Sequence, residues 1–204
     1  MRQDNLFQKR TTLTRLENKR NLRRFLIVCE GKKTEPNYFR KFPEKPEVYD
    51  RIDIFGTGYN TTSLVNEAIR LKNEAQKRGE PYIEVWCVFD KDDFSVDQFL
   101  AAIIIAGKNQ IKCAYSIEAF ELWYMLHFNF YDTALSRDQY KEKLTELLGK
   151  IYQKNDDGMY QLLKKRQNTA IKNARKLYAL QYKRSLSEQN PITTVFQLVE
   201  RLSP

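Results

Sequence analysis

The sequence FLIVCEG at residues 25–31 decides the fold of this chain, together with EVWCVFDKDD at residues 84–93. In each stretch, a short run rich in β-branched and aromatic residues ends abruptly in carboxylates. Such a run predicts a buried strand that delivers charge to the edge of a sheet. Open α/β sheets bind their ligands at this kind of edge.

The composition indicates one globular domain with a strongly basic balance. The chain has 204 residues and a net charge of +9, which favours polyanions such as nucleic acid, or anionic membrane surfaces. No apolar stretch approaches the roughly 20 residues that cross a bilayer, and the first residues lack the apolar core of a secretory signal. We therefore expect a cytoplasmic protein without a membrane span. A single histidine and the absence of a CxxC pair argue against structural zinc.

The chain divides into three parts by composition and periodicity. Residues 1–24 form a basic arm, residues 25–130 alternate between strand and helix patterns, and residues 131–204 form a basic helical extension packed on the core. Alternation of this kind predicts an α/β fold with a mainly parallel four-stranded sheet and helices on both faces. The expected strands are 25–29, 51–55, 84–89 and 111–117, and the expected helices are 36–42, 62–78, 96–106, 119–128, 136–150, 157–183 and 192–202.

The carboxylates at the strand ends predict a metal site. Residues two apart on an extended chain project to the same side, so Asp90 and Asp92 can face one ion, with Asp93 close behind. Glu30 can join them if the first and third strands are neighbours. Carboxylates without a histidine or cysteine cluster suit Mg²⁺, which in turn suggests phosphate chemistry. The alternative is a solvated acidic turn, with Glu30 as a helix N-cap.

Several motifs of the chain resemble a known family. Glu30-Gly31 and Asp90-x-Asp92, each after an apolar strand, resemble the two signatures of the Toprim fold of topoisomerases, primases and the overcoming-lysogenization-defect nucleases. The sequence IVCEGKKTEPNYF at residues 27–39 resembles the opening motif of the RloB family. Residues 89–93, 119–128 and 190–195 resemble its later blocks, so the likeness spans nearly all of the chain from Phe25 onward.

This resemblance implies a Toprim-like, metal-dependent nuclease of bacterial and archaeal defence loci, often encoded beside an ATPase partner or restriction-modification genes. Glu30 would act as general base or acid or as a metal-site residue, while Asp90 and Asp92 would hold Mg²⁺ or Mn²⁺. Nucleases of this fold can use two metals, and the further carboxylates available for the second are those of Glu35, Asp93 and Glu121.

Basic residues provide candidate contacts for a substrate. Lys32 and Lys33 follow Glu30 and can neutralise a phosphate in the transition state, although solvated loop lysines are the alternative. The turn at residues 56–60 lies between a strand and a helix, where backbone amides can hold a phosphate, but a plain tight turn is the preferred explanation. On the C-terminal helices, a phosphate-tracking surface or a merely solvated face would consist of Lys164, Lys165, Arg166, Lys172 and Arg175.

Two residues of the apolar segment 119–128 can each be interpreted in two ways. Glu121 either points away from the apolar stripe or is buried beside it, and a buried glutamate needs a metal or a partner. His127 can serve as a general acid, but a core histidine is the preferred interpretation.

These observations lead to two functional hypotheses. The first is a Mg²⁺-dependent endonuclease in antiviral, abortive-infection defence. The second is a catalytically degenerate subunit that binds nucleic acid or a partner and works with an ATPase. Primer synthesis is a third class, but the sequence contains no nucleotide-selective motif for it. Exposed aromatic residues are compatible with a homodimer.

Overall fold

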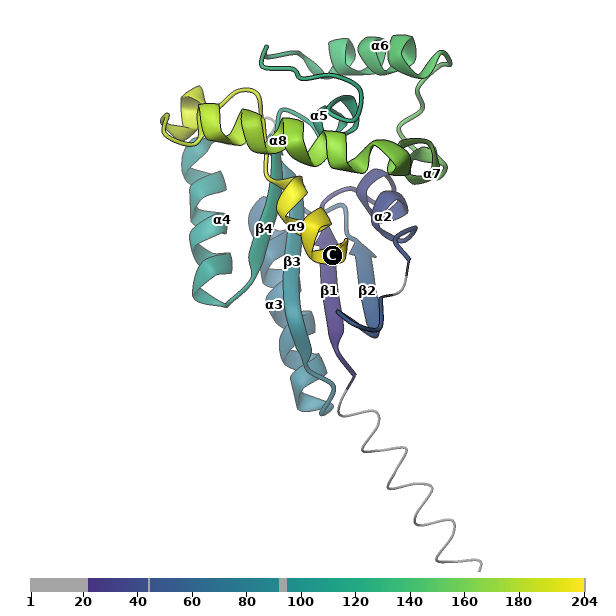
Figure 1. Cartoon of the computed structure of the whole chain (residues 1–204). Helices are drawn as coiled ribbons and strands as arrows, with labels where there is room; N and C mark the ends of the chain where they lie inside the picture. Colours follow the sequence, from purple (N-terminus) through teal and green to yellow (C-terminus); the bar gives the residue numbers. More distant parts are fainter. Residues whose placement is uncertain (1–21, 44, 92–94, 204) are drawn as a thin grey trace, which may run out of the picture.

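The computed structural model describes residues 22–43, 45–91 and 95–203 (Figure 1). The basic arm of residues 1–24 thus lies almost wholly outside the described residues. The strands are β1 (Arg24–Cys29), β2 (Arg51–Gly56), β3 (Tyr82–Asp90), β4 (Lys112–Ile117) and β5 (Ile192–Thr193). The α-helices are α2 (Thr34–Phe39), α3 (Thr61–Lys77), α4 (Val96–Lys108), α5 (Glu121–Met125), α6 (Arg137–Leu148), α7 (Met159–Leu163), α8 (Gln167–Gln181) and α9 (Val195–Leu202), and the 3₁₀ helices are η1 (Lys164–Arg166) and η2 (Leu186–Glu188).

The strands form one sheet in the order β2-β1-β3-β4-β5. The pairs β1–β2, β1–β3 and β3–β4 are parallel, and β4–β5 is antiparallel. The expected α/β architecture is therefore confirmed, and it is consistent with a Toprim-like fold. Because β1 and β3 are neighbours, the two acidic strand ends lie at the same edge of the sheet.

Helices cover both faces of the sheet, each over its own apolar cluster. On one face, Leu26 and Val28 of β1 pack with residues of α3 and α4 such as Leu64 and Phe99. On the other face, Phe25 and Ile27 belong to a cluster that continues through α2 and α5 into the helices of the C-terminal extension. Alternate residues of β1 thus point to opposite faces, as the pleat of a strand requires.

Helix ends follow the local sequence. The side chain of Ser95 caps α4 and that of Ser136 caps α6, each in a capping box with the glutamine three residues later. Gly149, with a φ of +65°, ends α6 in the left-handed conformation that glycine adopts without strain. These caps fix where the chain enters and leaves the helices.

The structure corrects the expected sheet and the expected C-terminal helices. The sheet has a fifth strand, β5, in the segment predicted to begin the last helix at residue 192. Side chains stabilise this two-residue strand, because the hydroxyls of Ser116 and Thr193 lie 2.9 Å apart across the β4–β5 pair. The helix predicted over residues 157–183 is instead divided into α7, η1 and α8.

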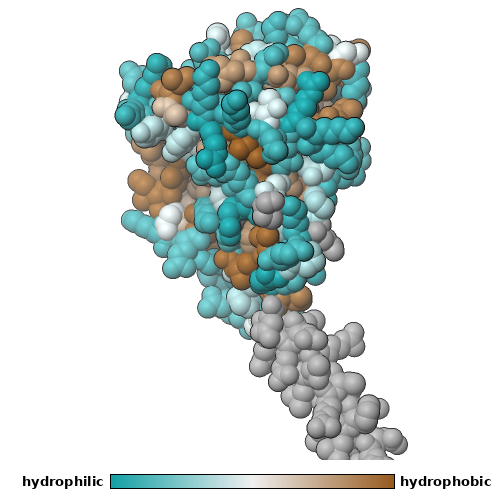
Figure 2. Space-filling model, viewed as in Figure 1, coloured by the Kyte–Doolittle hydropathy of each residue, from teal (hydrophilic) through white to brown (hydrophobic). Residues whose placement is uncertain are grey.

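The surface of the described residues is mixed. None of the helices among them is long and apolar enough to cross a membrane. The face shown in Figure 2 is largely hydrophilic over α8, whereas apolar surface gathers over α4, where Leu100 and Ile104 are exposed.

Candidate nuclease centre

Glu30 and Asp90 meet at the carboxyl end of the sheet, where β1 and β3 end side by side. The Asp90 backbone N–H donates to Glu30 Oε2 over 3.2 Å, and the Glu30 backbone N–H donates to the Val88 carbonyl over 2.9 Å. The Asp90 carboxylate accepts a hydrogen bond of 3.2 Å from the backbone N–H of Phe120. Two backbone N–H groups, those of Asp90 and Phe120, thus hold the two carboxylates in place.

Glu35, in the first turn of α2, turns its carboxylate back toward the end of β1. It is only 5% exposed, and a Cβ atom added at Gly31 would lie 2.1 Å from Glu35 Oε2. A side chain in place of Gly31 would therefore displace the Glu35 carboxylate from this position. Glu35 Oε2 is buried and has no hydrogen-bond partner within the described part of the chain.

Glu121, the first residue of α5, is the fourth carboxylate and is 3% exposed. Its Oε1 accepts a hydrogen bond of 2.9 Å from the hydroxyl of Tyr152, which follows α6. Tyr140 of α6 is also fully buried, and its hydroxyl is left without a partner by the described residues. Of the two alternatives for Glu121, the structure shows the buried one. Its hydrogen-bond partner, Tyr152, belongs to the helical extension.

The two tyrosines had no signal in the sequence that separated them from core residues. Tyr140 recurs with Leu144 at helical spacing, which is typical of an apolar stripe packed on a core. Only the folding of the extension over α5 brings their hydroxyls near the acidic residues. We use the term acidic cluster for Glu30, Glu35, Asp90 and Glu121.

Burial and the charges of neighbouring carboxylates raise pKa values within the acidic cluster. Burial raises the pKa of Asp90 well above its usual value, and the charges of Glu35, Glu121 and Glu30 raise it further, against the opposing hydrogen bond from Phe120. Burial likewise raises the pKa of Glu35, and Glu121 adds to the effect, while backbone hydrogen bonds and the charge of Lys154 act in the opposite direction. Bringing these carboxylates together costs free energy that a bound cation would recover.

The residues of the acidic cluster fit a hard divalent cation in chemistry. Carboxylate oxygens are the ligands that Mg²⁺ takes in proteins, and no described residue donates a hydrogen bond to the buried Glu35 Oε2. Among the described residues, no three His, Cys, Asp or Glu side chains form a group that could hold a metal ion as they stand. Asp92 and Asp93, which belong to the predicted site, lie outside the described residues.

The predicted basic residues occupy two places. Lys32 and Lys33 are exposed on the loop between β1 and α2, directly after Glu30. The C-terminal candidates are exposed on η1 and α8, which cross near the carboxyl ends of the strands in Figure 1. Two of them already make contacts: the Arg166 guanidinium lies 4.8 Å from the centre of the Phe128 ring, and Arg175 Nε donates to Glu200 over 2.6 Å.

His127 is a core residue. It is 1% exposed, and its Nδ1 lies 2.9 Å from the carbonyl oxygen of Trp123. Burial lowers the pKa of His127 to about 4, so the imidazole is neutral at pH 7. The preferred interpretation of a core histidine agrees with this burial.

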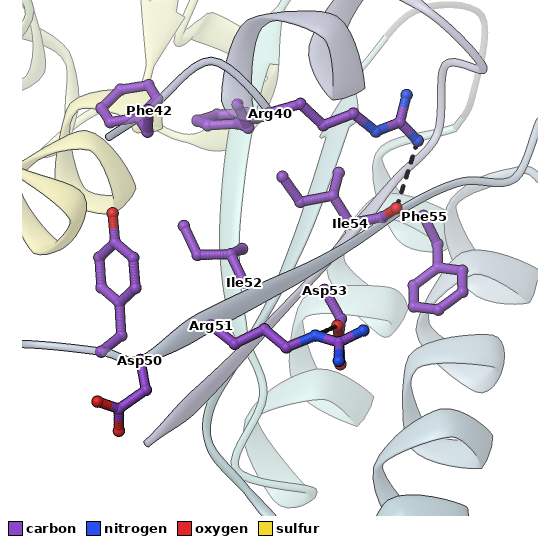
Figure 3. Close-up of a pocket in the computed structure, with 10 residues that line it drawn as sticks. Arg40, Phe42, Asp50, Arg51, Ile52, Asp53, Ile54 and Phe55 are labelled. Atoms are coloured by element: carbon purple, nitrogen blue, oxygen red, sulfur yellow. Dashed lines mark hydrogen bonds and ion pairs between the residues drawn. The ribbon is translucent and has the colours of Figure 1, made fainter. Parts of the chain in front are cut away.

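A cavity of about 600 Å³ lies beside the edge strand β2, away from the acidic cluster (Figure 3). Figure 3 shows Arg51 reaching toward Asp53 and the Arg40 guanidinium bonded to the Ile54 carbonyl oxygen, at 3.4 Å. None of the predicted site residues that the structure describes lines this cavity, so it does not mark the candidate centre.

Comparison with known proteins identifies the family. The profile of the RloB-like protein family matches residues 25–202, which is most of the chain and includes all four residues of the acidic cluster. No curated protein and no solved structure matches the chain. The matched span agrees with the motifs at residues 27–39, 89–93, 119–128 and 190–195. The chain therefore belongs to the RloB-like protein family.

Proposed function

We propose that this protein is a Mg²⁺-dependent nuclease of the Toprim type that hydrolyses phosphodiester bonds of nucleic acid. The observation that carries the proposal is the acidic cluster itself. Four carboxylates converge where β1 and β3 end, and two of them, Glu35 and Asp90, have pKa values raised by burial and by neighbouring carboxylates. A fold keeps such an unfavourable arrangement where a ligand or a reaction uses it.

Asp90 would hold the ion together with Asp92, and Glu35 and Glu121 provide further carboxylate oxygens. When bound, Mg²⁺ or Mn²⁺ supplies Lewis-acid activation of water and charge stabilisation at the phosphate.

Glu30 is the residue placed to move a proton. It lies at the end of β1, and the Asp90 backbone N–H holds its Oε2. Its carboxylate accepts a proton from the attacking water as the water oxygen bonds to phosphorus, and the bond from phosphorus to the leaving oxygen breaks. The leaving oxygen takes its proton from solvent. The Lys32 ammonium, two residues away, offsets the negative charge that develops on the phosphate oxygens.

The biological setting proposed for this activity is antiviral defence, of the abortive-infection kind, in the cytoplasm. The resemblance of the motifs to defence-associated nucleases supports it. The net charge of +9 supports nucleic acid as the substrate, because a basic surface attracts the phosphate backbone.

The test is hydrolysis of labelled DNA and RNA by the purified protein with Mg²⁺ or Mn²⁺. Asp90→Asn removes one charge and keeps the shape, so we expect it to lower the rate at least about a hundredfold. Asp132→Asn, at an exposed aspartate, is the matched control and leaves the rate unchanged. Intact substrates with the wild-type protein under all these conditions would refute the nuclease.

A second candidate function is a binding subunit with a degenerate site, which works with an ATPase. It is favoured by the absence, among the described residues, of three side chains already arranged as a metal site. Such a subunit binds polyanions with a steep salt dependence but gives no calorimetric signal for Mg²⁺ that Asp92→Ala removes. Calorimetry with wild-type protein and this variant distinguishes the two functions.

A further inference from the structure

A smaller cavity, about 230 Å³ in volume, lies between the first turns of α3 and α4. It is several times larger than the roughly 30 Å³ that a water molecule occupies in the liquid. Among the described residues, those that line it are polar and uncharged: Asn60, Thr61, Thr62, Ser63 and Gln98. These side chains offer hydrogen-bond donors and carry no negative charge.

The cavity lies at the N-terminus of a long helix. The backbone N–H groups of Thr61 and Thr62, at the first two positions of α3, have no carbonyl within the helix to bond. The next N–H, that of Ser63, donates to the Asn60 side chain over 3.2 Å. The first turn contains no acidic residue, so nothing in it neutralises the positive end of the helix dipole. Such a terminus attracts an anion.

An unpartnered hydroxyl also indicates a ligand in this cavity. Thr61 lines the cavity and is only 1% exposed. Its Oγ1 is buried without a hydrogen-bond partner among the residues that the structure describes. Leaving a buried hydroxyl unpaired costs about 1–3 kcal/mol relative to pairing it, and a ligand oxygen in the cavity would remove this cost.

The turn before α3 connects the cavity to the acidic cluster. The Gly58 backbone N–H donates to the carbonyl oxygen of Glu30 over 2.8 Å. Gly58 has a φ of +70°, and a Cβ atom added there would lie 2.5 Å from Lys32 Cε. The Lys32 side chain therefore packs against Gly58, in the turn that joins the end of β2 to the start of α3.

We propose that this cavity is a phosphate-binding subsite that holds a phosphate of the nucleic acid strand next to the one that is cut. The proposal rests on the nuclease function proposed above, since it places the strand relative to the acidic cluster. The bound group is either an internal phosphodiester or a terminal 5′-phosphate. Both present the same anionic oxygens to the α3 N-terminus and to the Thr61 hydroxyl.

The test variant is Ser63→Glu. A glutamate at the third position of a helix favours folding, because it completes a capping box and complements the helix dipole, but it places a negative charge beside the cavity. The matched control is Gln139→Glu, which adds the same charge at the third position of α6. A second variant, Thr61→Val, removes only the unpaired hydroxyl.

Binding is measured by fluorescence anisotropy with short DNA and RNA strands labelled at the 3′ end, in EDTA so that no strand is cut. We expect Ser63→Glu to weaken binding about tenfold relative to Gln139→Glu, with no loss of thermal stability. Thr61→Val should weaken binding about threefold. Strands with and without a 5′-phosphate separate the two sources: an equal effect indicates an internal phosphate, and an effect confined to the phosphorylated strand indicates a terminal one.

Equal affinities of the wild type, Ser63→Glu and Gln139→Glu would overturn the subsite, as would failure of the wild type to bind any of these strands. Hydrolysis has no part in this measurement. Weaker binding by Ser63→Glu in a protein that cuts nothing would therefore remove the nuclease proposal and leave the phosphate site in place.

Discussion

Buried charges are paired at the amino end of the sheet, whereas they repel one another at its carboxyl end. At the amino end, Arg24 of β1 forms a short ion pair with Asp53 of β2 and a second one, of 3.1 Å, with Glu80. The Tyr82 hydroxyl donates to Asp53 over 2.8 Å. Burial alone would raise the pKa of Asp53, but the hydrogen bonds from Tyr82 and Arg24 and the charges of Arg24 and Arg51 lower it on balance.

At the carboxyl end of the same strands, burial and the charges of Glu35, Glu121 and Glu30 raise the pKa of Asp90 instead. The two aspartates belong to the same sheet, so the fold itself does not dictate the difference. Asp53 is surrounded by groups that stabilise its charge in the folded chain. Asp90 is surrounded by groups that destabilise it, which is expected where a ligand completes the structure.

The largest effect on stability should come from breaking the paired end. Arg24→Met leaves Asp53 buried beside Tyr82 without its main cation, and we expect the free energy of unfolding to fall by about 3 kcal/mol in urea denaturation. Arg51→Met is the control, because Arg51 bonds the same carboxylate over 2.6 Å from an exposed position. It should cost about 1 kcal/mol or less. Equal losses in the two variants would show that burial of Arg24 is irrelevant.

Tyr152→Phe should have the next largest effect, since it removes the hydroxyl that bonds Glu121 and leaves that carboxylate buried among like charges. We expect the free energy of unfolding to fall by about 1.5 kcal/mol without metal. Tyr131→Phe, at a partly buried tyrosine, serves as the control and should be close to neutral. No change in Tyr152→Phe would mean that the extension does not stabilise Glu121.

Asp90→Asn should have the opposite sign. It removes one charge from the acidic cluster and keeps an oxygen to accept the bond from Phe120, so the metal-free protein should gain about 1 kcal/mol at pH 7. Thermal unfolding in EDTA measures this gain, with Asp132→Asn as the control. A loss of stability in Asp90→Asn would contradict the repulsion inferred for the cluster.

The pH dependence of that gain tests the direction of the pKa shifts. The folded-state pKa of Asp90 lies above its ordinary value of 3.8, so Asp90 stabilises the fold fully below that value and this contribution is lost as pH rises through the folded pKa. The advantage of Asp90→Asn should therefore grow from about pH 4 upward. Asp53 has the opposite shift: its contribution is present above 3.8 and is lost as pH falls through the folded pKa.

The destabilisation by Asp53→Asn should accordingly become smaller as the pH falls. The stabilisation by Asp90→Asn should also become smaller, so the stabilities of the two variants relative to the wild type should change in opposite directions with pH. Parallel pH profiles for the two variants, measured by thermal unfolding in EDTA, would contradict the comparison of the two ends.

Much of the fold follows from local pattern. The four long strands and the helices α3 and α4 were predictable because apolar runs end at clear punctuation, such as Gly79 after α3. The strand β5 was not predictable, since two residues carry no periodicity and its pairing with β4 depends on Ser116 and Thr193. The break between α7 and α8 was also missed, because residues 157–183 keep a helical composition throughout.

The part of the candidate site that lies at strand ends was predictable from the sequence. Glu30 and Asp90 were expected to meet if their strands were neighbours, and the sheet order places them together. The contacts of Tyr152 with Glu121 and of Lys32 with Gly58 join segments distant in sequence. No local pattern encodes such tertiary contacts.

The central claim is that the acidic cluster is completed by a divalent cation. The most direct measurement is thermal unfolding of the wild type and of Asp90→Asn, with and without Mg²⁺ or Mn²⁺. A ligand that binds only the folded state stabilises it by mass action, so the wild type should unfold at a higher temperature when the metal is present at many times its Kd. Asp90→Asn should be more stable than the wild type in EDTA and should gain little or nothing from metal. An equal gain in both proteins, or no gain in the wild type, would contradict the account.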